Sequence, residues 1–340
     1  MQEDRGWNVG STALNHVFEQ MQIDAAWSVR TEQRFDWWGH RLRQEVWADP
    51  PVLSDGVLVT RLRARTVVLE DVPQAEETLE KVSNMNRLAT LNAFDFDPTT
   101  RAISLGCSFK IHGGSADWGS QLFLHAVVTQ ACEAERVADI AQELFGGRIA
   151  ESAHPTSGAR PSPDEMLTVI EKSYVPVGEG ASHFGLADFE AAERAAEGIS
   201  VLTNAGEEGL TAEFPYFGTK ASVSHLVESV GEEAPSGPQT ALFQAEADQR
   251  HPTYGGGCLL RLTLPLGGVT HAQAVQLNRA EALNDGEEYL VSLGAWCVGP
   301  LGLTHVCFLP NGVRMGGLVG TMLQYDAYRT RWARQVLAGA

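Results

Sequence analysis

Asparagine followed by arginine occurs at two places in this chain, as Asn86-Arg87 and Asn278-Arg279, and each pair falls within a predicted helix. An asparagine side chain both donates and accepts hydrogen bonds, and a buried one must satisfy both groups. We expect the two pairs to bond to neighbouring backbone and acidic groups within their own part of the fold. Contact with a partner is the alternative.

Three large aromatic rings, Phe35, Trp37 and Trp38, gather at a predicted hairpin. A hairpin is hard to bury completely, and exposed aromatic side chains carry much of the energy at protein interfaces. We therefore predict that these rings bind a partner, and the alternative is a lid on the core. Adjacent strand residues point to opposite faces, so at least one tryptophan could belong to the core.

No motif for catalysis or cofactor binding is recognisable. The stretch 218–221 lacks the Gly-Lys-Ser/Thr order of a phosphate loop, the ten histidines form no zinc-hydrolase pair, and no nucleophile elbow occurs. The glycines at 312–320 are typical of close helix packing, with phosphate binding as the alternative. Asp95 and Asp97 are typical of a turn, since a hard cation needs more oxygen ligands than two carboxylates. We expect no catalytic residue, metal or cofactor, although catalytic groups can converge from distant positions.

Hydrophobic periodicity predicts an α+β chain in which one order of elements occurs twice. In the first half, helices are expected at 12–21, 74–91 and 132–144, and strands at 25–35, 40–47, 57–69, 102–111 and 120–128. In the second half, helices are expected at 217–230, 271–283 and 312–337, and strands at 241–248, 258–266, 289–297 and 303–309. The complete order is α-β-β-β-α-β-β-α, and one strand of the second copy is not evident.

Residue matches in the same order along both halves support an internal duplication. Arg61-Leu62 matches Arg261-Leu262, Asn86-Arg87 matches Asn278-Arg279, and 103–106 resembles 291–294. We predict a first module at 1–146 and a second at 216–340. Residues 147–215 are expected to form an acidic, partly helical linker or insertion, with helices at 163–173 and 187–196.

Composition indicates an acidic protein with reduced cysteines. The net charge is −18, and residues 131–250 hold 7 lysines and arginines against 21 acidic residues, which disfavours nucleic acid as a partner. The five cysteines form no CxxC pair and are expected in the core. Neither a bilayer-spanning apolar stretch nor a signal layout is recognisable. We therefore expect a cytoplasmic protein with no membrane partner.

The residues Met85-Asn86-Arg87 with 94–97, and more faintly Leu277-Asn278-Arg279 with Tyr289, resemble the YbjN-like family and its structural relatives, the type III secretion chaperones. The resemblance covers about 10–147 and 217–337. It departs from the family pattern because two modules occur in one chain. It implies protein-binding factors without catalytic residues, and secretion chaperones of this kind are acidic homodimers that hold extended segments.

These observations predict two tandem type III secretion chaperone-like modules, with antiparallel sheets and flanking helices, packed as an intramolecular pseudo-dimer. The predicted function is that of a chaperone-like or adaptor protein that holds a segment of another protein. A small-molecule enzyme with its site between the modules is the main alternative, and a structural assembly protein is another. A cleft with a perturbed acid or histidine would favour the enzyme, and an exposed apolar groove would favour binding.

Overall fold

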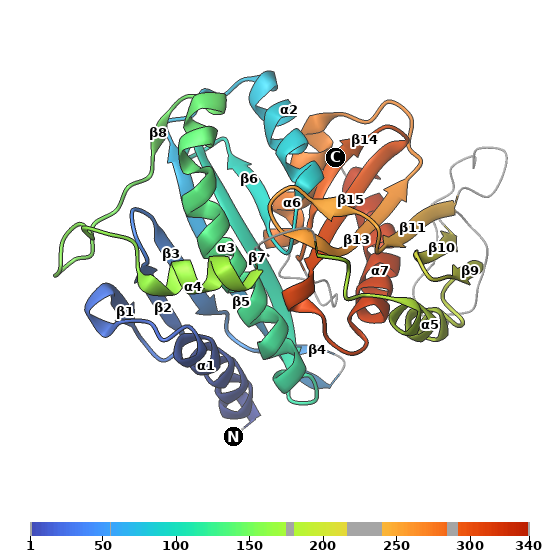
Figure 1. The fold of residues 1–340 in the computed structure, drawn as a ribbon, viewed down its shortest axis with the longest axis horizontal. Helices are drawn as coiled ribbons and strands as arrows, with labels where there is room; N and C mark the ends of the chain where they lie inside the picture. Colours follow the sequence, from blue (N-terminus) through green and yellow to red (C-terminus); the bar gives the residue numbers. More distant parts are fainter. Residues whose placement is uncertain (1, 55, 175–179, 216–239, 284–291, 339–340) are drawn as a thin grey trace.

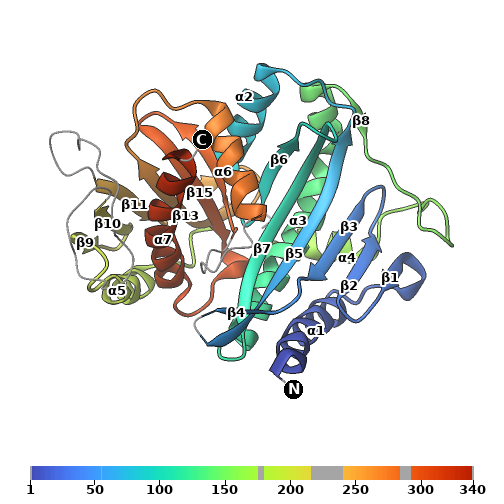
Figure 2. The same cartoon turned by 180° about the vertical axis from the view of Figure 1, so that it is seen from behind.

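The computed structural model of the chain describes residues 2–54, 56–174, 180–215, 240–283 and 292–338. Two antiparallel sheets lie side by side, and each has helices packed against it (Figure 1, and from behind in Figure 2). The α+β class predicted from the sequence is confirmed.

The first sheet has the strand order β1-β2-β3-β5-β7-β6, with β4 and β8 each paired to β5. Its strands are β1 (Ser28–Arg30), β2 (Arg34–Trp38), β3 (Arg43–Ala48), β4 (Val52–Ser54), β5 (Val57–Glu70), β6 (Ala93–Asp97), β7 (Ala102–His112) and β8 (Arg148–Ile149). The helices of this module are α1 (Gln2–Gln20), α2 (Glu76–Met85) and α3 (Ala116–Phe145), with short 3-10 turns η1 (Ala25–Trp27) and η2 (Asn86–Leu88).

The second sheet has the order β9-β10-β11-β13-β15-β14, with β12 paired to β13. Its strands are β9 (Leu202–Ala205), β10 (Gly209–Pro215), β11 (Thr240–Glu246), β12 (Arg250–His251), β13 (Gly255–Leu264), β14 (Ala295–Gly299) and β15 (Gly302–Pro310). Its helices are α5 (Leu186–Ala195), α6 (His271–Leu283) and α7 (Leu318–Ala338), and η3 (Asn311–Val313) precedes α7. Apart from β8, which has no counterpart among the described residues of the second module, the order matches the first sheet strand for strand, including the side pairing of β4 and β12. The two modules therefore share one topology.

The second module begins earlier in the chain than the sequence predicts, near Leu186 instead of residue 216. β9 and β10 extend the second sheet beyond β11, and α5 packs against α7 as α1 packs against α3. The two helices expected in the linker are present as α4 (Glu165–Tyr174) and α5. The helix expected at 217–230 lies outside the described residues, as do positions 289–291 of one expected strand.

The strand predicted at 120–128 is instead the middle of α3. Helix α3 packs against β5 and β7 on one side and against α1 and α4 on others. Its apolar residues from Leu122 to Val128 are therefore buried on several faces of the helix. A helix buried all round shows no 3.6-residue period, which is why this stretch has the pattern of a strand.

One buried asparagine in each module hydrogen-bonds the second helix region to the terminal strand of the sheet, β6 or β14. The Nδ2 group of Asn86 donates to the Phe94 carbonyl at 2.9 Å, and its Oδ1 accepts the Phe94 N–H at 2.9 Å. Asn278 makes the same two bonds with Trp296, at 2.9 and 2.6 Å. Both asparagines are at most 3% exposed. The structural role expected for these two residues is confirmed.

The asparagine bonds also define which residues of the two modules are equivalent, because they align Phe94 with Trp296. When this alignment is carried through the strand pairings, Arg65 corresponds to Arg261. The predicted match of Arg61 with Arg261 is therefore wrong. The predicted match of 103–106 with 291–294 is wrong too. The first stretch lies in β7, whereas residues 292–294 precede β14.

The modules meet through equivalent elements. Helix α2 packs against α6, β6 contacts α6, and β14 contacts α2. Contacts that repeat when two units are exchanged are typical of an isologous dimer interface. Ser108 and Ser292 also exchange backbone hydrogen bonds of 3.1 and 3.0 Å across the junction.

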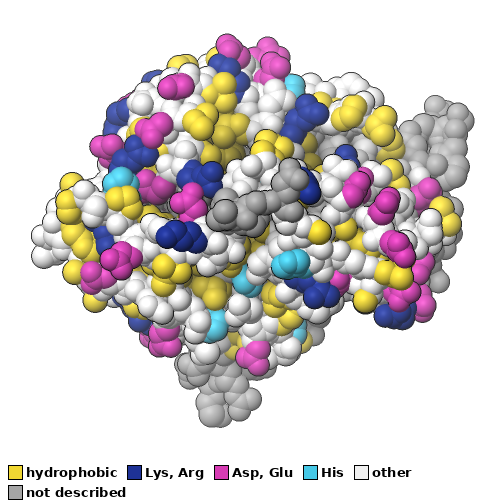
Figure 3. Space-filling model, in the orientation of Figure 1, with side chains coloured by type: hydrophobic (Ala, Val, Ile, Leu, Met, Phe, Trp, Pro, Cys, Tyr) yellow, Lys and Arg dark blue, Asp and Glu magenta, His cyan; other side chains and the backbone are white. Residues whose placement is uncertain are grey.

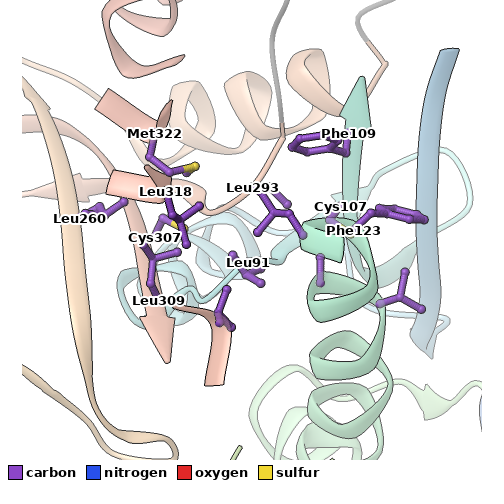
Figure 4. Close-up of a cluster of buried hydrophobic side chains, with 14 of the residues drawn as sticks. Leu91, Cys107, Phe109, Phe123, Leu260, Leu293, Cys307, Leu309, Leu318 and Met322 are labelled. Carbon is purple, nitrogen blue, oxygen red and sulfur yellow. The ribbon is translucent and has the colours of Figure 1, made fainter. Parts of the chain in front are cut away.

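The hydrophobic core is continuous across this junction. A single cluster of buried side chains includes residues of both sheets and of α1, α3, α5 and α7. Figure 4 shows Leu91 and Leu293, which precede β6 and β14, between Phe109 of the first module and Cys307 of the second. Separation of the modules would expose these side chains to water, so the two modules stabilise each other.

Replacing Asn278 with alanine should lower the free energy of unfolding by roughly 2–4 kcal/mol, because the buried N–H and C=O of Trp296 would lose their partners. Asn86→Ala should have an effect of the same order. The control is Asn84→Ala, an exposed asparagine two residues earlier, which should change stability by less than about 0.5 kcal/mol. Urea unfolding followed by tryptophan fluorescence measures all three, and wild-type stability in both buried-site variants would contradict this role.

Candidate functional site

The aromatic hairpin is buried. Phe35, Trp37 and Trp38 are 1%, 1% and 3% exposed, so the prediction that they form an exposed anchor is wrong. Phe35 packs edge-on against Phe18 of α1 with ring centroids 5.4 Å apart, and Trp37 shares the main core cluster with Leu167 of α4. Elements distant in the sequence cover the hairpin, and local spacing gives no sign of them.

Trp38 contacts another stretch of the same chain. Residues 150–164, here called the connecting segment, run from β8 to α4 without forming a helix. The Trp38 indole N–H donates to the Ser152 hydroxyl at 3.1 Å, and the His154 ring lies edge-on to the indole at 4.9 Å. The guanidinium of Arg160 donates to the Trp38 carbonyl at 2.9 Å and lies over the Trp27 ring at 5.0 Å.

The connecting segment also covers the outer edge of the first sheet, where β1 is the terminal strand. Nδ1 of His154 accepts the Ser157 N–H at 3.0 Å, which leaves Nε2 as the proton-bearing nitrogen, 3.4 Å from the Ser28 carbonyl. The Ser157 hydroxyl donates to the Ala26 carbonyl at 2.6 Å. The main-chain carbonyls of the module thus accept most of the hydrogen bonds that hold this non-helical segment.

Trp37→Ala should lower the free energy of unfolding by roughly 3–5 kcal/mol, because it leaves a large cavity among α1, α3 and α4. The matched control is Tyr328→Ala, which truncates an exposed aromatic side chain of α7 and should cost far less. Thermal unfolding measured by circular dichroism compares the two variants. Equal melting temperatures for the wild-type chain and Trp37→Ala would contradict the burial of this ring.

A half-buried carboxylate lies where the two modules meet. Glu133 of α3 accepts the Thr90 hydroxyl at 2.6 Å and the Asn92 amide at 3.4 Å, and Tyr254 of the second module also hydrogen-bonds to it. Burial raises the pKa of Glu133 above its ordinary value, and these hydrogen bonds oppose the rise. Glu133 and Tyr254 are far apart in sequence, so no motif could indicate this pairing.

A small pocket with a cavity volume of about 10 Å³ lies beside Tyr254, which bonds to this carboxylate. It is lined by Thr129, Cys132, Arg136, Ile170, Glu171, Tyr174 and Tyr254. This volume is about what one water molecule needs and is far below the range of small-molecule clefts. Burial raises the pKa of Cys132 to about 12, so its thiol stays protonated and is a poor nucleophile. Among the residues that the structure describes, no group of three or more His, Cys, Asp and Glu could hold a metal ion.

The two arginines of the sequence repeat have different surroundings. Arg87 is exposed, whereas Arg279 forms an ion pair of 3.1 Å with Asp97 of the other module. The expectation that both act within their own module is therefore wrong for Arg279. Asp95 lies on the same strand, and its Oδ1 is buried without a hydrogen-bond partner. Burial raises the pKa of Asp95 to about 6, against the attraction of Arg279.

Asp95→Asn should make the chain more stable at neutral pH, by roughly 1–3 kcal/mol, and remove one source of its pH dependence. The folded-state pKa of Asp95 is raised from 3.8 to about 6, so the folded state binds the extra proton between these values. The stabilisation that comes from this proton on Asp95 is therefore full at low pH and is lost as the pH rises through about 6.

Unfolding free energies at several pH values, from acid to neutral, measure the difference between Asp95→Asn and wild type. The variant's advantage in unfolding free energy over wild type should grow as the pH rises from about 4 to above 6. Burial also raises the pKa of Asp326 to about 6. Asp326 is present in both the wild type and the variant, so its effect on stability cancels from the difference between them. A gap that is independent of pH would contradict the assignment to Asp95.

Within the described residues, no helix combines the length and the apolar character needed to cross a lipid bilayer. No known protein family, curated protein sequence or solved structure matches the chain. The likeness to the YbjN-like family and the secretion chaperones therefore stays a prediction.

Proposed function

We propose that the chain is a non-enzymatic, chaperone-like or adaptor protein that holds non-helical segments of other proteins. The observation that supports this proposal is the connecting segment. It lies beside the outer edge of the first sheet, where its side chains donate to main-chain carbonyls of the module.

The contacts of the connecting segment are mainly to the backbone of the module. Besides the Ser28 and Ala26 carbonyls, the Val68 carbonyl accepts the Ala150 N–H at 3.0 Å and the Arg41 carbonyl accepts the Ser152 N–H at 2.9 Å. Main-chain hydrogen bonds give affinity for extended segments of varied sequence, while side-chain contacts give specificity. Trp38 supplies such a side-chain contact here.

The way in which the modules meet supports the same function. The exchange of contacts between α2 and β6 on one side and α6 and β14 on the other is the arrangement of a dimer within one chain, a type III secretion chaperone-like pseudo-dimer in our proposal. Fusion makes the second unit intramolecular and so present at high effective concentration. Because the modules meet through β6 and β14, the strands at the opposite ends of the sheets, β1 and β9, lie at the two ends of the molecule (Figures 1 and 2).

A small-molecule enzyme with its site between the modules is the second candidate function. The raised pKa of Glu133 favours it, because an acid of this kind at a junction is a frequent feature of active sites. The oxygens of Glu133, however, are already hydrogen-bonded to Thr90, Asn92 and Tyr254. Those bonds give the carboxylate a structural role in joining the modules.

The full-length chain, tagged and isolated from cells that naturally produce it, should retain one or a few proteins. Each should form a complex of defined stoichiometry when the purified components are mixed and examined by native mass spectrometry. Glu133→Gln, which removes the junction carboxylate but leaves both outer edges unchanged, should bind the same proteins equally well.

The enzyme alternative predicts a different pair of results. No purified candidate would form a complex, and the chain would convert a small molecule at a rate that Glu133→Gln reduces. That outcome would replace the binding function with catalysis at the junction.

A further inference from the structure

The outer edges of the two sheets differ in what covers them. The connecting segment covers β1, whereas β9 is the terminal strand of the second sheet and has no comparable cover among residues 2–54, 56–174, 180–215, 240–283 and 292–338. Figure 1 shows these two strands at opposite ends of the molecule. The same element is thus closed in one module and open, as far as it is described, in the other.

The backbone of β9 offers hydrogen-bonding groups at this open edge. The N–H of Gly206 donates to the Gly209 carbonyl at 2.8 Å, and bonded pairs alternate along an antiparallel ladder. Leu202 and Asn204 therefore direct their backbone groups to β10, and Thr203 and Ala205 direct theirs outward. Through the ladders, Thr203 is the equivalent of Ser28, whose outward carbonyl receives His154 in the first module.

Two exposed apolar side chains lie at the start of β9, and acidic side chains lie beside the strand. Val201 and Leu202 are 65% and 58% exposed. By the pairing of β9 with β10, Glu213 occupies the place that Trp38 has in the first module. A carboxylate therefore stands where the closed edge has an indole.

The two edges also differ in charge. Residues 186–213 contain seven acidic residues and one arginine, whereas 25–38 contain two of each sign. Asp188 is paired with Arg314 at 3.2 Å, and the remaining acids, Glu190, Glu193, Glu197, Glu207, Glu208 and Glu213, are exposed or half-buried. Figure 3 shows acidic side chains gathered over the end of the molecule where Figure 1 has α5 and β9. A basic partner is attracted to this field and an acidic one repelled.

We propose that the outer edge of β9 binds an extended, lysine- or arginine-bearing segment of another protein, which adds to the second sheet as a further strand. This inference rests on the proposed protein-binding function. Thr203 and Ala205 supply the main-chain hydrogen bonds, Val201 and Leu202 contact apolar side chains of the segment, and Glu213 pairs with a basic one.

A short blocked peptide that alternates valine and arginine is the probe, and fluorescence anisotropy with the full-length chain is the measurement. Ala205→Pro removes an outward N–H but no bond between β9 and β10, and should weaken binding at least tenfold. Leu202→Lys, at an exposed position, should weaken it similarly by removing an apolar contact and adding repulsion. Arg30→Pro, at the equivalent place on β1, is the matched control and should leave the affinity unchanged. Circular dichroism checks that each variant is folded.

A peptide that alternates valine and glutamate should not bind. Affinity for the valine-arginine peptide that stays the same in both Ala205→Pro and Leu202→Lys would overturn the placement at β9, even if the full-length chain still captures a protein partner. If the peptide binds as expected but the chain captures no partner, the proposed function fails while the binding edge stands.

Two other occupants of the edge give distinct results. Binding that occurs only after residues 216–239 are replaced by a glycine-serine linker would assign the edge to the chain itself. A dimer of the chain that Ala205→Pro dissociates in analytical ultracentrifugation would assign it to a second copy. Either result would overturn the proposal of an external basic segment.

Discussion

The structure depends on the way in which unpaired backbone groups at sheet edges are satisfied. Strands β6 and β14 are the terminal strands at which the two modules meet, so their outward N–H and C=O groups are buried by the junction. A buried backbone group without a partner costs free energy comparable to a lost hydrogen bond. Asn86 and Asn278 supply a donor and an acceptor to Phe94 and Trp296, and the two edges can then be buried.

The same constraint explains the other end of the first sheet. At β1 the solution is a segment of the chain: His154 donates to the Ser28 carbonyl, where a further strand would otherwise pair, and Ser157 donates to the Ala26 carbonyl of the preceding turn η1. Edge strands that keep free backbone groups are open to pairing with another chain. The acidic residues around β9 make such pairing selective, because they repel segments of like charge.

Sequence alone could predict the α+β class and the presence of two modules, because most strands and helices carry a clear period, but it placed a strand in the middle of α3 and began the second module too late. It could also predict the structural asparagines, since a polar residue that recurs at the same point of two helices indicates a shared bond. It could not predict the burial of Trp37 and Trp38, which depends on α1, α4 and the connecting segment folding back over the hairpin. Glu133 and Tyr254 carry no local signal either, because a hydrogen bond between distant positions requires no spacing.

Duplication within one chain removes a restriction that holds for any homodimer. In a homodimer every substitution is made twice, once in each subunit, and both copies of a surface change together. Here the two equivalent places are coded separately, so Trp38 and Glu213 can differ, as can exposed Arg87 and paired Arg279. The chain keeps the contacts of a symmetric pair at its centre while its two ends are free to acquire different chemistry.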